Sequence, residues 1–498
     1  MLSRRSFLGG PALVGRPSAA RRPNLLFLIA DDHRHDVLGA AGNRRAETPN
    51  LDRLARQGTR FSHHYVNNYP MCTPSRQSML TGRLPHACGV PLLASVLADE
   101  QLTLAEQLRD AGYLTAGFGK MHFNRRPAPG IHGFEIALVD GAFREAWRAE
   151  VKPRPVPPEI AVKPPWRPFR DPARIWLNAD KLPYPRYEED MAGTFLARRA
   201  AAFLRNPPKR PFAVWVSFFE PHSPFDFPIE YRDRFDPAQF AAPRPGPEDA
   251  WQIPLIFREL SERDKQGIIA AYYTSVAFLD RNIGLVLEAL AQAGLEEDTL
   301  VIYWSDNGYS LGEHGRFEKH CLYEPAVRVP LIVRFPGRVP AGRVVEALTE
   351  SLDLAPTLVE LLGAPPLAGM QGEGLVPHLE GSGRARGRDH VFSEYLHNEE
   401  LMIRTRRWKL IYCSGRRKRD DGYETERPTP GRYLRLFDLE RDPGEFTDRS
   451  ASYPEVTAEL IRLALARFRA THPEAGGEPP GLSAEDALDW YLRPRPAS

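Results

Sequence analysis

The sequence is 498 residues long and almost neutral, with 66 basic and 64 acidic side chains and a net charge of +2. A chain of this length can bury a large core, and its 42% hydrophobic and 26% charged composition is typical of a globular protein rather than a disordered one. The balanced charge excludes a global field that would recruit nucleic acid, and four scattered cysteines without a C-x-x-C pair exclude a disulfide framework.

The N-terminal segment SRRSFLGGPALVG places Arg4 and Arg5 before a short apolar stretch. This arrangement resembles a twin-arginine export signal over residues 1–20, with the export machinery as a partner and a periplasmic or secreted location. An unprocessed tail and a cytoplasmic location remain the alternative, since the apolar stretch is short. No later run approaches the roughly 18 apolar residues of a membrane span, so no transmembrane segment is predicted.

Four apolar runs farther along the chain each end in polar, ionisable residues. They are NLLFLIADD (24–32), YLTAGFGKMH (113–122), FAVWVSFFEPH (212–222) and TLVIYWSDNG (299–308). Such runs predict buried strands of a mostly parallel sheet. Apolar residues that recur every three or four positions over 269–290 predict a helix between two of them. The expected class is therefore α/β, with helices on both faces of a central sheet.

The rest of the sequence indicates a long irregular loop and a second structural unit. Residues 151–190 are rich in proline and lack periodicity, which indicates a long loop that shapes a substrate pocket or serves as a surface connection. Beyond Gly381, RRWKLIYC and YLRLFDLERDPGE predict paired antiparallel strands, followed by an amphipathic helix. We expect a catalytic domain over 21–380 and a C-terminal α+β subdomain over 381–498.

The polar strand ends predict one site, because ligands of open α/β sheets bind beyond the carboxyl ends of the strands. Asp31, Asp32, Asp306 and Asn307 all offer oxygen donors, which suit Ca²⁺ or Mg²⁺ and suit zinc poorly. A surface acidic pair is the alternative for the first two. This alternative is less favoured, because each of the two polar pairs directly follows an apolar strand.

The segment MCTPSRQSMLTG (71–82) predicts a short helix, with Pro74 in its first turn and Gly82 at its end. Cys72 then lies just before the helix N-terminus, where unpaired N–H groups favour an anion. Together with Arg76, Lys120 and Lys319, this indicates a site for a tetrahedral oxyanion such as sulfate or phosphate.

The motif C-T-P-S-R followed by LTG resembles the signature of the type I, formylglycine-dependent sulfatases of the alkaline-phosphatase-like superfamily. Further segments resemble the family in its order across residues 22–450. These are ADDHRHD, TPNLDRLARQG, GKMH, EPHSPF, SDNGYSLGEHGRFEKH, LYEPAVRVPLIVRFPG, SLDLAPTLVELLG and LFDLERDPGEFTD. Met121 and Asn124 depart from the family, which commonly has Trp and Gly at these positions.

The resemblance implies that a formylglycine-generating or anaerobic maturation enzyme oxidises Cys72 to formylglycine. One hydroxyl of its hydrate would attack sulfur, and the second would eliminate sulfate from the resulting ester. The implied ligands of one Ca²⁺, with Mg²⁺ second, are Asp31, Asp32, Asp306, Asn307 and the modified Cys72. The implied catalytic and substrate residues are Arg76 and Lys120 on the diol, His122 as base, His222 as acid and Lys319 on sulfate. His314, in the segment GEHG near the Asp306 strand, is a candidate substrate contact.

The resulting hypothesis is hydrolysis of a sulfate monoester of a carbohydrate or another alcohol. Two alternatives remain open from the residues and the resemblance. One is a phosphonate monoester or phosphodiester hydrolase that uses the same site. The other is a non-catalytic relative that binds sulfated glycans and leaves Cys72 reduced.

Overall fold

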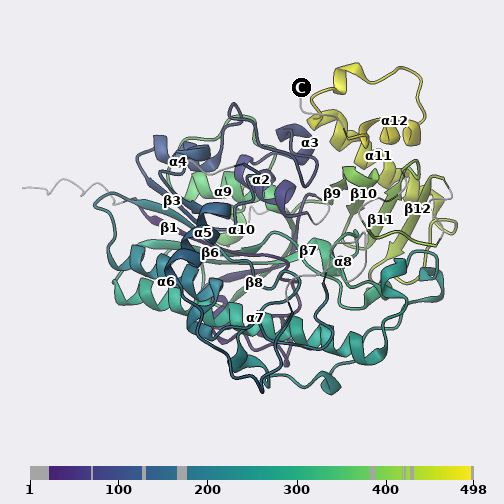
Figure 1. Ribbon diagram of the computed structural model, residues 1–498. Coiled ribbons are helices and arrows are strands. Elements are labelled where there is room, and N and C mark those ends of the chain that lie inside the picture. The colour runs from purple at the N-terminus through teal and green to yellow at the C-terminus, as the bar shows by residue number, and fades with distance from the viewer. Residues whose placement is uncertain are drawn as a thin grey trace, which may run out of the picture.

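The structure, a computed structural model, describes residues 22–68, 71–125, 130–164, 176–381, 387–417, 419, 422–426 and 431–494 (Figure 1). The predicted export signal at residues 1–20 lies outside these ranges. Within them, no helix combines the length and the apolar character needed to cross a lipid bilayer.

The described chain forms a central sheet of eight strands in the order β4-β3-β5-β1-β6-β7-β2-β8. The pairs β4–β3, β3–β5, β5–β1, β1–β6 and β2–β8 are parallel, and only the pairs of β7 are antiparallel. The four apolar runs identified in the sequence are the adjacent strands β3, β5, β1 and β6. The strand bounds are β1 Asn24–Ala30, β2 Thr59–Tyr65, β3 Leu114–Gly119, β4 Ile136–Val139, β5 Phe212–Ser217, β6 Thr299–Ser305, β7 Arg328–Arg334 and β8 Arg343–Glu350.

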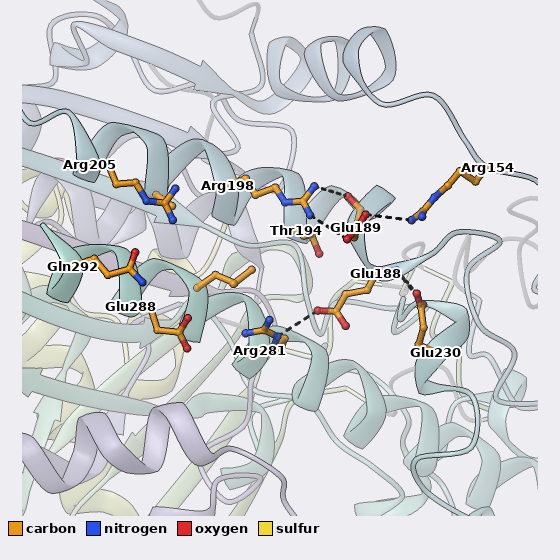
Figure 2. Close-up of a pocket in the computed structure, with 12 residues that line it drawn as sticks. Arg154, Glu188, Glu189, Thr194, Arg198, Arg205, Glu230, Arg281, Glu288 and Gln292 are labelled. Carbon is orange, nitrogen blue, oxygen red and sulfur yellow. Dashed lines mark hydrogen bonds and ion pairs between the residues drawn. The ribbon is translucent and has the colours of Figure 1, made fainter.

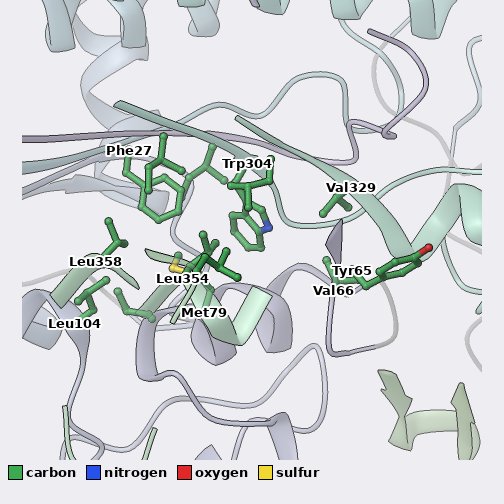
Figure 3. Close-up of a cluster of buried hydrophobic side chains, with 14 of the residues drawn as sticks. Phe27, Tyr65, Val66, Met79, Leu104, Trp304, Val329, Leu354 and Leu358 are labelled. Atoms are coloured by element: carbon green, nitrogen blue, oxygen red, sulfur yellow. The ribbon is translucent and has the colours of Figure 1, made fainter. Parts of the chain in front are cut away.

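Helices cover both faces of the sheet, because alternate side chains of the central strands point to opposite sides. Leu26 and Leu28 of β1 pack in the apolar cluster that includes α1 (Pro49–Gln57), α5 (Asp140–Glu150), α6 (Ala192–Arg205) and α7 (Glu262–Gln292). Phe27 of β1 instead faces the cluster of Figure 3, with Met79, Leu104 and Leu358. These come from α2 (Cys72–Thr81), α4 (Leu104–Asp110) and α9 (Leu354–Leu361), and α10 (Val376–Leu379) joins the same cluster. The predicted fold class is confirmed.

A second sheet forms the C-terminal part, shown in light green to yellow in Figure 1. It is antiparallel, in the order β12-β11-β10-β9. Two helices pack on it through Leu460, Phe468 and Leu488. The bounds are β9 Val391–Tyr395, β10 Glu400–Arg404, β11 Trp408–Cys413, β12 Tyr433–Asp438, α11 Pro454–Thr471 and α12 Ala484–Tyr491. The antiparallel sheet and α11 agree with the sequence pattern, whereas α12 had no predicted counterpart.

A buried ionic cluster joins this second sheet to the central sheet. Lys409 of β11 is completely buried, and its Nζ lies 2.7 Å from Glu445 Oε1 and 3.3 Å from Glu324 Oε1. Glu324 also accepts a hydrogen bond of 2.8 Å from the Tyr65 hydroxyl of β2. Breaking a buried ion pair by removing one partner is costly, because the other charge stays buried without compensation.

We therefore expect Lys409→Met to lower the free energy of unfolding by about 3–5 kcal/mol. Denaturant titration followed by circular dichroism measures this change. The control Arg462→Met removes an exposed pair with Glu459 and should cost less than about 1 kcal/mol. Equal losses for the two variants would contradict a special role for the buried cluster.

Candidate active site

The polar residues at four strand ends lie together around the start of α2. Because β3, β5, β1 and β6 are neighbours and parallel, their carboxyl ends meet at one edge of the sheet. The residues that the structure brings into this cluster are Asp31 and Asp32 after β1, Lys120 and His122 after β3, His222 after β5, and Asp306 and Asn307 after β6, with Cys72 and Arg76 of α2 and Lys319.

Cys72 is the first residue of α2, one position inside the predicted start, and its side chain is almost fully buried. Its Sγ lies 3.3 Å from Asp31 Oδ1, 3.0 Å from Lys319 Nζ and 3.4 Å from Lys120 Nζ. The helix ends at Gly82, whose φ of 66° is a left-handed conformation that glycine adopts readily. The thiol is thus held between a carboxylate and two ammonium groups at a helix N-terminus.

The acidic cluster fits a hard divalent cation. Carboxylate oxygens of Asp31, Asp32 and Asp306 and the sulfur of Cys72 all lie within 4.8 Å of one another. Asp32 Oδ2 and Asn307 Oδ1 are buried and accept no hydrogen bond from any residue that the structure describes. Burial raises the pKa of Asp32 to about 6 and that of Asp306 well above its usual range. A cation among these oxygens would compensate their burial.

Three basic side chains surround the carboxylates. Arg76 Nε donates to Asp306 Oδ2 at 2.6 Å, Lys319 Nζ donates to Asp32 Oδ1 at 2.7 Å, and Lys120 Nζ donates to Asp31 Oδ2. Burial alone would raise the pKa of Asp31, but the neighbouring positive charges hold it well below its usual range. The site therefore combines anionic oxygens for a cation with ammonium and guanidinium groups for an oxyanion.

The two predicted catalytic histidines lie on the border of the cluster and differ in their contacts and exposure. His122 lies close enough to Cys72 for the two groups to influence each other's protonation, and burial lowers the pKa of its imidazole. His222 Nδ1 lies 2.6 Å from the Ser223 carbonyl, which accepts its hydrogen, so Nε2 faces the cluster at 3.9 Å from Asp32 Oδ2. The latter side chain is 38% exposed, so an incoming substrate can reach it.

His314 lies in a different setting from the other predicted site residues. It is buried, its Nδ1 lies 3.0 Å from Asp249 Oδ1, and its ring stacks on Tyr323 with 3.6 Å between centroids. This environment favours a structural role. Among the described residues, His314 contacts Asp249 and Tyr323 rather than the acidic cluster. A contact between His314 and the substrate therefore stays a prediction.

Asp140 is a site residue that the sequence analysis missed. Its carboxylate accepts hydrogen bonds from the backbone N–H groups of Met121, His122 and Phe123, at 2.9, 2.7 and 3.1 Å. The turn that it holds includes His122 in a left-handed conformation, with φ of 61°. The available signal was the position of Asp140 directly after the strand Ile136–Val139, which matches the placement of the other polar residues.

We expect Asp140→Ala to lower kcat about 10- to 100-fold, because three backbone donors lose their acceptor and the turn that carries His122 relaxes. Asp140→Asn keeps one acceptor oxygen and should lose less. Steady-state kinetics measures both, and the pH profile of kcat should shift in Asp140→Ala if the effect passes through His122. Loss of thermal stability with an unchanged pH profile would instead indicate a merely structural role.

Two cavities differ in their relation to this cluster. One of about 730 Å³ lies between α6 and α7, and its charges pair with each other, as in Arg198 with Glu189 and Arg281 with Glu188 (Figure 2). The other, of about 490 Å³, is lined by Lys120 and His222 and so opens onto the cluster. The second cavity therefore adjoins the predicted catalytic residues.

Comparisons with known proteins agree with this geometry. The Sulfatase family model matches residues 23–364, and the model described as N-sulphoglucosamine sulphohydrolase, C-terminal, matches residues 312–469. The chain is 30% identical to an arylsulfatase of Clostridium perfringens, over 89% of this chain and 94% of the relative. It is 27% identical to a choline-sulfatase of Rhizobium meliloti, over 95% and 91%.

A solved structure with a similar fold is the phosphonate monoester hydrolase of Agrobacterium radiobacter. The two structures superpose with a TM-score of 0.76 at 26% identity, over 92% of this chain and 97% of that one. The family match extends over more than half of the chain and spans the strands that carry the acidic and basic cluster. The chain belongs to the sulfatase family and is a sulfuric ester hydrolase.

Proposed function

We propose that the chain hydrolyses sulfate monoesters of a carbohydrate or another alcohol at position 72, after Cys72 has been converted to formylglycine. The observation that carries the proposal is the placement of the Cys72 sulfur, 3.0 and 3.4 Å from two lysine ammonium groups and beside the acidic cluster. Formylglycine hydrate supplies a geminal diol, one hydroxyl of which attacks sulfur while the other provides the route for sulfate release.

We assign one Ca²⁺, with Mg²⁺ as the second choice, to the oxygen donors at this site. The residues that would hold it are Asp31, Asp32, Asp306 and Asn307, together with the modified position 72. Such a cation lowers the cost of the negative charge that develops during sulfuryl transfer. The fit rests on the buried oxygens that have no hydrogen-bond donor in the described chain.

The other residues bind, orient and move protons. Lys120 and Lys319 bind the sulfate oxygens, because both ammonium groups already point at position 72. Arg76 orients the site by donating hydrogen bonds to the Asp306 carboxylate and the Lys120 carbonyl. His122 takes the proton from position 72, and His222 gives a proton from Nε2 to the leaving alcohol oxygen.

The paired arginines near the N-terminus support export of the protein. Export in turn constrains when Cys72 is oxidised. We propose that residues 1–20 direct the protein to the periplasm or the medium, that 21–380 form the catalytic domain, and that 381–498 form the C-terminal subdomain. Twin-arginine substrates are typically moved folded, so a maturation enzyme would oxidise Cys72 in the cytoplasm. Reduced Cys72 in protein purified from the periplasm would contradict this order.

A direct test compares the purified, matured enzyme on 4-nitrophenyl sulfate, on sulfated monosaccharides and on bis(4-nitrophenyl) phosphate. We expect kcat/KM to be highest for a sulfate monoester. The second candidate function, hydrolysis of phosphonate monoesters or phosphodiesters, is supported by the likeness to the Agrobacterium enzyme. Higher kcat/KM for the phosphodiester than for all sulfate esters would favour that candidate.

A further inference from the structure

The cavity of about 490 Å³ beside Lys120 and His222 has walls that the reaction itself does not use. They come from α5, from the loop after β5 and from the segment that leads into α6. Trp147, Tyr184 and Phe219 contribute aromatic surface to these walls. His222 Nε2 faces the acidic cluster while the same side chain lines this cavity, so the cavity offers space for the alcohol part of an ester bound at position 72.

Two arginines give the cavity an uncompensated positive charge. Arg144 and Arg148 are four positions apart on α5, so they lie on the same face of the helix, and both line the cavity. The Arg144 guanidinium lies 5.1 Å from the centre of the Phe219 ring, which holds it at the wall. Neither arginine forms an ion pair with any residue in the part of the chain that the structure describes.

The acidic residues of the same wall do not neutralise these arginines. Asp226 Oδ1 lies 2.6 Å from Lys163 Nζ, which offsets its charge. Glu220 is buried and forms no ion pair with either arginine in the described part of the chain. Two exposed guanidinium groups beside aromatic surface are a combination that binds a ring with an anionic substituent.

We propose that this cavity is the leaving-group subsite, and that it selects a ring-bearing alcohol with a second anionic group, a carboxylate or a sulfate, bound by Arg144 and Arg148. The ring packs on Phe219 and Tyr184, while its esterified oxygen stays at His222. This inference rests on the proposed function, since it concerns the alcohol that the same site releases. A cationic alcohol is disfavoured, because the two guanidinium groups repel it.

The test compares matched substrates with one and two anionic groups. The aryl pair is phenyl sulfate and 3-carboxyphenyl sulfate, and the sugar pair is N-acetylglucosamine 6-sulfate and N-sulfoglucosamine 6-sulfate. We expect the doubly anionic member of at least one pair to have a kcat/KM about 10-fold higher or more. Arg144→Gln and Arg148→Gln should each raise its KM about 10-fold, with kcat and the singly anionic partner little changed.

The matched control is Arg462→Gln, which removes the same charge from α11 of the second unit and should leave both substrates unchanged. The pair that shows the preference identifies the ring as aryl or sugar. Equal kcat/KM within both pairs, or a preference that both variants retain, overturns the proposal. Equal loss on singly and doubly anionic esters also overturns it, since the arginines would then act on the reacting sulfate.

A binding measurement separates this inference from the proposed function. Calorimetric titration of the Cys72→Ala protein with the doubly anionic esters needs no turnover and no formylglycine. Affinity that falls about 10-fold with Arg144→Gln in this background supports the subsite even if no ester is hydrolysed. Absence of binding by a folded Cys72→Ala protein that retains its melting temperature contradicts the subsite, whatever the wild-type activity.

Discussion

Replacing Cys72 by alanine is expected to lower kcat/KM for sulfate esters at least about a thousandfold, because in the proposed mechanism the nucleophile is made from this side chain alone. The cluster around it should persist in the variant. The missing atom is a single buried sulfur, and the carboxylates and basic groups also contact one another directly. Steady-state assays with 4-nitrophenyl sulfate and a thermal melt measure the two effects separately.

The matched control is Cys321→Ala, which removes another buried thiol. Burial raises the pKa of Cys321 to about 11, whereas at Cys72 the charges of Lys120 and Lys319 outweigh burial and lower the thiol pKa. Activity of the control should stay within about twofold of the wild type, as expected for a thiol without a chemical role. Capture of the wild-type Cys72 peptide by a hydrazide reagent would demonstrate the aldehyde. Substantial activity in Cys72→Ala would contradict the assignment.

The sequence was sufficient for the four adjacent strands β3, β5, β1 and β6 and for the polar residues at their ends, because both depend on local patterns. Short continuous apolar runs such as 24–30 and 299–305 are typical of buried strands, and the polar residues that follow them are read directly from the chain. Their convergence needed one more rule, which is that parallel strands end at the same edge. The structure adds the order β3-β5-β1-β6, which makes those ends neighbours.

Features that depend on distant pairing were not predictable in the same way. β2 pairs with β8, about 280 positions later in the chain, and β7 runs against both of its neighbours, which no local periodicity indicates. His314 shows the same limit at the site. Its motif follows the Asp306 strand closely, yet its ring stacks on Tyr323 and pairs with Asp249, which is 65 positions away. Proximity in sequence therefore did not establish a role at the cluster.

Asp31→Asn should lower kcat/KM at least about 100-fold and reduce the calcium content of the purified protein. This carboxylate lies nearest to position 72, with Oδ1 at 3.3 Å from Cys72 Sγ, and the isosteric amide loses a negative charge with little change in shape. Inductively coupled plasma mass spectrometry measures the bound metal. Treatment of the wild type with EGTA should reproduce the loss, and added Ca²⁺ should restore activity better than Mg²⁺.

The control for this experiment is Asp280→Asn, a buried carboxylate of α7 that accepts backbone hydrogen bonds from Asn50 and Leu51. It should lower stability by about 1–3 kcal/mol and leave the metal content unchanged, which separates a loss of ligand from a loss of packing. Activity that survives EGTA in protein free of metal would contradict the cation. A cation that binds only the folded protein stabilises it, so removal of the cation should also lower the melting temperature of the wild type.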